Sequence, residues 1–174
     1  MTKMIFVNLP VKDLAASTRF YEALGCEKNE QFSDESASSM VWSDTITVQL
    51  LQNEYYSTFT SKKIADAKET SEVLIALTRD SRDDVNATVE AGARAGGTAD
   101  TREPLDMGFM YNRVVEDPDG HVLGSPGPLG SIIRRQTHVT SLCHRTGTGR
   151  LRAGSRPNAT GRRARRSQRD ADVL

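Results

Sequence analysis

The cysteines and histidines of this 174-residue sequence, which could serve in catalysis or metal binding, are few and lie far apart. The two cysteines, Cys26 and Cys143, form no ligand pattern, so we expect isolated thiols. Of the three histidines, His121 directly follows a turn sequence, whereas His138 and His144 lie in an arginine-rich segment. The spacing of these residues does not predict a metal site.

Arg113 has a planar guanidinium that can bind an acidic group of a ligand through two parallel hydrogen bonds. The same side chain can instead pair with Glu116 or Asp117 of its own chain. The sequence is compatible with both interpretations.

The run Asp-Pro-Asp-Gly at 117–120 predicts a tight turn. Proline sets φ for the second turn position, the first aspartate can bond its own backbone, and glycine accepts a positive φ. We therefore expect a hairpin in which a strand over 108–116 reverses into a second strand that begins at His121.

The second strand of this hairpin is expected to be cut short. After Leu123 the chain reads Gly-Ser-Pro-Gly-Pro-Leu-Gly, and proline cannot donate to a ladder. The 108–116 strand would then keep unpaired backbone groups and the fold would lose stability, unless His138–Leu142 supplies a substitute strand.

The first half of the chain predicts a strand, a helix and three further strands. Asp13 is a favourable N-cap for the helix, Gly25 supplies its stop, and Pro10 is expected to end the first strand. The expected ranges are 4–9 for the first strand, 14–24 for the helix, and 26–32, 39–42 and 45–51 for the later strands.

The second half repeats this order of elements. Ser81 and Asp84 form a capping box for a helix that ends at Gly96. The polar linker 53–71 carries Tyr55, Tyr56 and Phe59, which either form a lid or pack on the domain edge. The expected ranges are 72–77 (strand), 82–95 (helix), 98–103 (strand), and the hairpin over 108–116 and 121–123.

Charge divides the sequence into two unlike parts. Residues 1–124 hold 12 Lys and Arg against 21 Asp and Glu, a net charge of −9, while residues 125–174 hold 11 Arg against 2 Asp, a net charge of +9. The second part can bury little apolar surface, so we expect it to be disordered. No apolar run reaches the roughly 18 residues of a membrane span, and no signal peptide is recognisable, so we expect a soluble cytoplasmic protein.

Three stretches together resemble one protein family. They are Val7–Leu14, Phe20–Gly25 and Asp117–His121. Over residues 3–123 the chain is similar to the vicinal oxygen chelate superfamily, which includes glyoxalases (lactoylglutathione lyases), bleomycin-resistance proteins and extradiol dioxygenases. The combination of motifs is specific for the fold and not for an activity.

This resemblance implies an α+β fold of two βαβββ modules, whose mixed sheets curl into an open cup with helices on the convex side. Family members commonly pair, so a homodimer is expected. The implied boundaries are 1–124 for the glyoxalase-like domain, with module one over about 3–52, the linker at 53–71 and module two over 72–124, followed by a basic tail over 125–174.

In the metal enzymes of the family, His, Glu or Gln ligands lie on the first and last strands of each module. The corresponding residues here are Phe6, Gln49, Leu74 and Gly124, and of these Gln49 alone has a side chain able to bind a metal. A catalytic divalent metal needs about three protein ligands. We therefore predict no metal and no other cofactor, with a divalent metal as the less favoured alternative; in the family pattern His121 is a structural residue beside the turn.

The cup implied by the resemblance combines aromatic and polar side chains, the usual composition of a small-molecule site. The favoured function is metal-free binding of a small, partly aromatic molecule, as in bleomycin-resistance proteins; the alternative is a metal-dependent lyase or dioxygenase with an unrecognised site. Phe6 and Tyr111 can also be read as core residues. The predicted lining residues are Phe6, Asn8, Thr47, Gln49, Leu74, Phe109, Tyr111 and Arg113.

The tail over 125–174 has two further interpretations. Its abrupt change of composition is typical of an out-of-frame reading of GC-rich coding sequence. It could also be a basic arm, centred on Arg162–Arg166, that contacts nucleic-acid phosphates. The tail contains no Lys and no aromatic residue, so we expect no specific nucleic-acid partner and no membrane partner.

Elemental analysis and metal titration of the purified protein test the metal prediction. We expect no stoichiometric nickel, zinc or iron, because one ligand position in four carries a donor. Tight, stoichiometric binding that Gln49→Ala abolishes would contradict this prediction.

Overall fold

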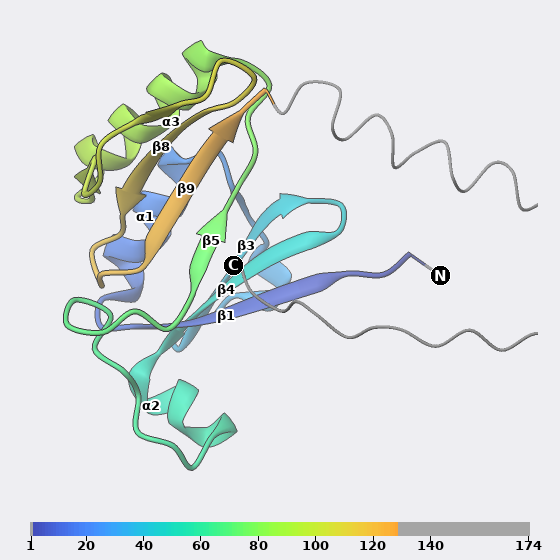
Figure 1. Cartoon of the computed structure of the whole chain (residues 1–174). Coiled ribbons are helices and arrows are strands. Elements are labelled where there is room, and N and C mark those ends of the chain that lie inside the picture. Colours follow the sequence, from blue (N-terminus) through green and yellow to red (C-terminus); the bar gives the residue numbers. More distant parts are fainter. Residues whose placement is uncertain (1, 129–174) are drawn as a thin grey trace, which may run out of the picture.

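The computed structural model describes residues 2–128, which form two sheets with one long helix each and a connection between them (Figure 1). Module one consists of β1 (Ile5–Val11), α1 (Leu14–Ala23), β2 (Glu27–Lys28), β3 (Ala37–Ser43) and β4 (Ile46–Gln52). The connection holds α2 (Asn53–Tyr56) and a 3-10 turn (Ser57–Phe59). Module two consists of β5 (Leu74–Ala76), α3 (Arg82–Arg94), β6 (Thr98–Ala99), β7 (Leu105–Asp106), β8 (Tyr111–Glu116) and β9 (Val122–Gly127).

Each module builds one sheet, and the two sheets have the same topology. The strand order is β1-β4-β3-β2 in the first sheet and β5-β9-β8-β6 in the second, where β7 also pairs with β8. In both sheets the first strand runs parallel to the last, and the remaining pairs are antiparallel. The predicted α+β fold of two βαβββ modules is therefore confirmed, with the second strand of module two divided into β6 and β7.

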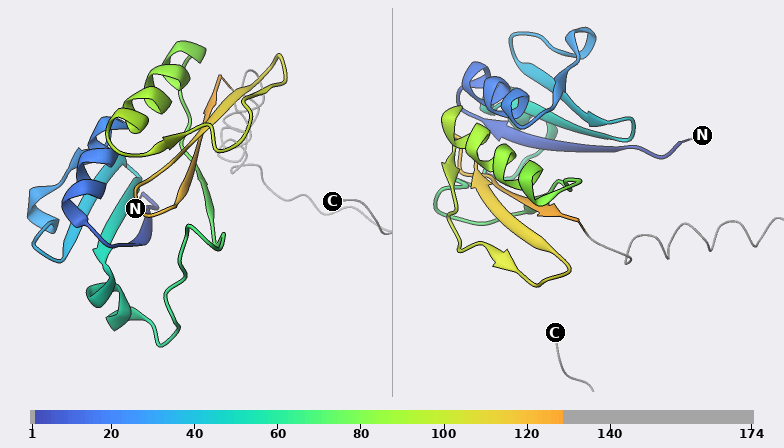
Figure 2. Two further views of the ribbon diagram at one scale, coloured as in Figure 1. Left: turned by 90° about the vertical axis from the view of Figure 1, so that its left-hand side faces the viewer. Right: turned by 90° about the horizontal axis from the view of Figure 1, so that it is seen from above.

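Both long helices begin at the predicted caps. The Asp13 carboxylate accepts a hydrogen bond from the N–H of Ala16 at 2.9 Å, and the Ser81 hydroxyl accepts one from the N–H of Asp84 at 3.0 Å. The capping residues satisfy backbone donors that have no partner inside the helix. α1 packs on the first sheet and α3 on the second, and the two helices lie side by side (Figure 2).

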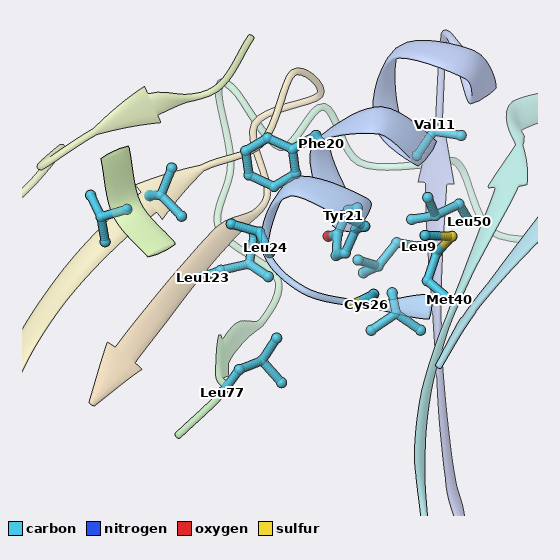
Figure 3. Packing of buried hydrophobic residues seen from close by; sticks show 13 residues of the cluster. Leu9, Val11, Phe20, Tyr21, Leu24, Cys26, Met40, Leu50, Leu77 and Leu123 are labelled. Carbon is cyan, nitrogen blue, oxygen red and sulfur yellow. The ribbon is translucent and has the colours of Figure 1, made fainter. Parts of the chain in front are cut away.

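A single core joins the two modules. Phe20 and Tyr21 of α1 are fully buried and meet edge to face, with ring centres 5.4 Å apart. Figure 3 shows α1 between side chains of the first sheet, such as Leu9, and side chains of the second module, such as Leu123. A Cβ atom at Gly97 would collide with the Phe20 ring, so module two offers a recess that module one fills.

The Asp-Pro-Asp-Gly turn also binds module two to module one. Asp119 accepts hydrogen bonds from the backbone N–H of Lys12 and from the Ser17 hydroxyl, both at 2.9 Å. Asp117 accepts one from the Tyr21 hydroxyl at 3.3 Å and two more from N–H groups of its own turn. Both carboxylates are buried, and we call this pair the carboxylate anchor.

Burial raises the pKa of Asp117 above its ordinary value, opposed by the nearby His121 and by the N–H donors. Because the pKa is raised in the fold, protonation of Asp117 favours folding at acid pH, and this contribution is lost as the pH rises through the raised pKa. At neutral pH the hydrogen bonds of the anchor offset part of the cost of the buried charge.

Arg79 forms a second link between the modules. Its guanidinium lies 4.1 Å from the centre of the Trp42 ring and donates a hydrogen bond at 3.0 Å to the carbonyl of Leu24. Arg79 follows β5, while both of its partners belong to module one. The guanidinium combines cation–π attraction with a hydrogen bond across the module boundary.

Pro10 does not end β1, contrary to the prediction. β1 is an edge strand, and the backbone groups of Pro10 face away from β4, so the missing N–H costs no ladder hydrogen bond. The carbonyl of Pro10 lies 2.9 Å from Nε2 of His121, which donates to it. In the structure His121 therefore ties β1 to the turn.

The second strand of the hairpin is not cut short, which corrects the prediction. β9 extends to Gly127 and pairs with β8 over its whole length. The carbonyl of Pro126 accepts a hydrogen bond from the N–H of Arg79 at 2.8 Å, so the proline backbone faces away from β8 and its missing N–H takes no bond from the hairpin. β8 is therefore paired along its whole length, and the expectation of unpaired backbone groups on this strand is wrong. His138–Leu142, named above as a substitute strand, lies outside the described residues.

Four expected strands are shorter than predicted: 72–77 is strand over β5 alone, 108–116 is strand over β8 alone, and the other two are 26–32 and 98–103. The segment 26–32 forms β2 and then a 3-10 turn (Glu30–Phe32), because the Asn29 side chain accepts a hydrogen bond from the N–H of Gln31 at 3.0 Å. The segment 98–103 is strand only over β6, after which Asp100 has a φ of +52°. No helix within residues 2–128 has the length and apolar character needed to cross a membrane.

Replacement of Asp119 by alanine tests the carboxylate anchor. Asp119→Ala leaves the Lys12 N–H and the Ser17 hydroxyl without their acceptor, so we expect a loss of about 1–3 kcal/mol in the free energy of unfolding, measured by urea titration. The exposed control Glu103→Ala should change it by no more than about 0.5 kcal/mol. Equal midpoints for Asp119→Ala and the unmodified protein would show that the anchor contributes nothing.

Candidate functional site

The face of the first sheet opposite α1 is the floor of an open hollow of about 490 Å³. Side chains alternate along a strand, so Phe6 and Asn8 of β1 point to this face while Leu9 points to the core. Asn8 pairs with Gln49 across β1 and β4, and Nε2 of Gln49 donates a hydrogen bond to the Ser39 hydroxyl at 3.0 Å. Two amide groups thus give the floor its polar character.

Four aromatic side chains surround this floor, and we call the site the aromatic hollow. Phe6 belongs to β1, Phe32 to the turn after β2, and Tyr55 and Phe59 to α2 and the turn that follows it. The rings of Tyr55 and Phe59 meet edge to face with centres 5.1 Å apart. The exposed fractions of Phe6, Phe32 and Phe59 are 54%, 64% and 66%, so the rings are open to a ligand.

Three of the eight predicted cup residues line the aromatic hollow: Phe6, Asn8 and Gln49. Thr47 has the same orientation on β4 but is buried. Leu74 lies on β5 of the other sheet, is 73% exposed and does not line the hollow. The predicted convergence of Phe6, Gln49 and Leu74 in one hollow therefore holds for the first two alone.

The remaining three predicted cup residues lie elsewhere in module two. Phe109 is exposed in the turn between β7 and β8. The Tyr111 hydroxyl donates to the Asn86 side chain on α3 at 3.2 Å, which places Tyr111 on the face covered by the helix. Arg113 points the same way, since side chains two residues apart share a face.

Arg113 pairs with Asp100, and not with Glu116 or Asp117 as one interpretation had it. Its Nε and Nη2 atoms donate to the two carboxylate oxygens at 3.0 and 2.6 Å. These hydrogen bonds hold the pKa of Asp100 below its ordinary value. Asp100 thus takes up both the paired hydrogen-bond donors and the charge of Arg113 within the fold.

The four positions carried over from metal enzymes do not form a metal site. Phe6 and Gln49 share the aromatic hollow, but Leu74 lies outside it and Gly124 has no side chain. Within residues 2–128, no three His, Cys, Asp or Glu side chains are grouped closely enough to hold a metal ion. This donor set does not fit a divalent metal.

Sequence reasoning missed Phe32, and it left Tyr55 and Phe59 undecided between a lid and edge packing. A signal for the latter two was present, because a spacing of four residues places them on one face of a helix. Phe32 carries no such signal, since its position depends on the turn that Asn29 caps.

A smaller cavity of about 240 Å³ lies between β1 and the residues that precede β5. Its lining includes Val7, Tyr56, Val73 and His121, and Nε2 of His121 is already bound to the Pro10 carbonyl. The aromatic hollow is larger and has free polar and aromatic groups, so it is the better candidate for a ligand.

Cys26 is a free thiol in the core, where burial raises its pKa to about 12. The reactive form of cysteine is the thiolate, so this residue is not a nucleophile at neutral pH. The prediction of an isolated thiol is confirmed for Cys26, while Cys143 lies outside the described residues.

Comparison with known proteins agrees with this architecture. Residues 3–124 match the model of the Glyoxalase/Bleomycin resistance protein/Dioxygenase superfamily, and the chain belongs to this family. The resemblance inferred from the three sequence motifs is thereby confirmed. The comparison with curated proteins found no match.

Several solved structures share the fold. A hypothetical protein from S. aureus is 26% identical, with a TM-score of 0.62 over 74% of this chain and 95% of that chain. A glyoxalase/bleomycin resistance protein/dioxygenase family enzyme from Burkholderia phytofirmans PsJN is 18% identical, with a TM-score of 0.60 over 72% and 98%. The fosfomycin resistance protein FosX from Mesorhizobium loti is 20% identical, with a TM-score of 0.52 over 79% and 98%. At these identities the last two show the fold alone.

Thiol labelling tests the burial of Cys26. In a Cys143→Ser variant at pH 8, about one Cys26 in 10,000 is ionised, so we expect iodoacetamide to leave the folded protein unmodified over hours, as measured by mass spectrometry. The same protein in guanidinium chloride should be labelled completely. Labelling of the folded protein at the unfolded rate would contradict the buried position.

Proposed function

We propose that this protein binds a small, partly aromatic molecule in the aromatic hollow without the help of a metal ion. The observation that carries this proposal is the set of exposed aromatic rings around a floor of amide groups. Rings bind flat apolar ligands by stacking or edge contacts, and amides select orientation by hydrogen bonding. The family membership supplies the scaffold on which such a site is built.

The alternative, a metal-dependent lyase or dioxygenase, requires a set of about three metal ligands. Gln49 is the only donor at the four corresponding positions, and it offers a single neutral amide oxygen. Binding of a ligand is therefore the function that the hollow supports better than catalysis.

A homodimer is part of this proposal. Large apolar side chains are exposed on module two, including Leu74, Met107 and Phe109 at 73%, 51% and 52%. A second copy of the chain would remove part of this apolar surface from water.

A ring deletion tests the site. Edge and stacking contacts of one ring contribute about 0.5–1.5 kcal/mol, so Phe59→Ala should weaken the binding of 1-naphthylmethanol by about 2- to 13-fold in calorimetric titration. The control Met4→Ala removes a similarly exposed apolar side chain that lies outside the hollow and outside the proposed dimer surface, and it should leave the affinity unchanged. Equal losses in both variants, or no loss in either, would place the ligand elsewhere.

A further inference from the structure

We propose that the natural ligand of the aromatic hollow is an organic cation, such as an aromatic molecule that carries an ammonium group. This inference rests on the proposed function and adds the charge of the ligand. It follows from one side chain, Asp34, and from the rings beside it.

Asp34 is the only charged residue among the described residues that line the hollow. The other polar groups of the lining belong to neutral side chains such as Asn8, Gln31 and Gln49. No Lys, Arg or His of residues 2–128 lines the hollow, so a ligand carboxylate or phosphate would lose water without gaining a cationic partner.

The Asp34 carboxylate is held in place by the backbone and forms no ion pair, although it also borders a second hollow of about 680 Å³ that Lys12, Arg19 and Lys28 line. One oxygen, Oδ1, accepts hydrogen bonds from the N–H groups of Ser36 and Ala37 at 2.7 and 2.9 Å. Within residues 2–128, no basic side chain lies within ion-pairing distance of Asp34; the neighbouring Lys28 pairs with Glu30 at 2.9 Å instead. The carboxylate is therefore available to a cation from outside the chain.

The aromatic rings favour the same charge. The face of an aromatic ring carries partial negative charge and attracts ammonium and other organic cations. Phe32 comes from the same turn region as Asp34, and Tyr55 and Phe59 line the same hollow. A ligand with an apolar ring and a positive group could use the aromatic side chains and the carboxylate together.

The described part of the chain as a whole carries an excess of negative charge, while the full chain has a formal net charge of zero. The charged residues of the described part are those of residues 1–124, with 12 Lys and Arg against 21 Asp and Glu, or −9. A field of this sign attracts cations and repels anions, with a range set by salt.

Three probes of one shape test this inference on the full chain: 1-naphthylmethylammonium, 1-naphthylmethanol and 1-naphthoate. We expect the cation to bind about 2- to 30-fold more tightly than the alcohol in calorimetric titration, and the anion more weakly than either. Asp34→Asn removes the charge but keeps an oxygen for the N–H groups of Ser36 and Ala37. In this variant the preference for the cation over the alcohol should shrink, because only the contribution of the rings remains, while the affinity of the alcohol should not change.

Glu22→Gln is the matched control, because it removes one negative charge from an exposed residue of α1 outside the hollow. This variant should keep the preference for the cation. Equal binding of cation and alcohol, tightest binding of the anion, or a preference that Asp34→Asn leaves undiminished would overturn the inference while leaving the proposed function in place, provided that Phe59→Ala still weakens the alcohol. If none of the three probes binds, the proposed function itself fails.

Discussion

The buried carboxylates of Asp117 and Asp119 are the interaction on which the arrangement of the two modules depends. They lie in a turn of module two, yet their partners Lys12, Ser17 and Tyr21 belong to the junction of β1 and α1 in module one. A buried carboxylate is costly unless donors surround it, so the turn has a strong preference for this one position. The position of β1 relative to the second sheet follows from this constraint.

The family and the order of elements could be predicted from sequence because local signals specify them. Asp13 and Ser81 as caps, and Gly25 as a stop, act within one turn of a helix and need no knowledge of the rest of the chain. The two prolines were misjudged for a different reason. Pro10 and Pro126 fit within strands because the backbone of Pro10 faces away from β4 and that of Pro126 faces away from β8, and these directions depend on the register of the sheet.

The same dependence on register explains why the predicted residues of β1 line the aromatic hollow while those of β8 do not. In module one the alternation along β1 was read correctly, so Phe6 and Asn8 were placed on the open face. In module two the odd-numbered residues of β8 were assigned to the cup, and they face α3 instead, as the contacts of Tyr111 and Arg113 with Asn86 show. Period-two alternation gives two equivalent assignments, and only tertiary packing selects one of them.

The contact of Phe20 with Gly97 shows that the two duplicated halves of the molecule are not equivalent at their interface. One half of the molecule contributes a protruding ring, and the other contributes the bare backbone that accommodates it. Two copies of the first half would bring ring against ring, and two copies of the second would leave a void. Although the halves share a topology, they have become complementary parts of one folding unit and are no longer interchangeable repeats.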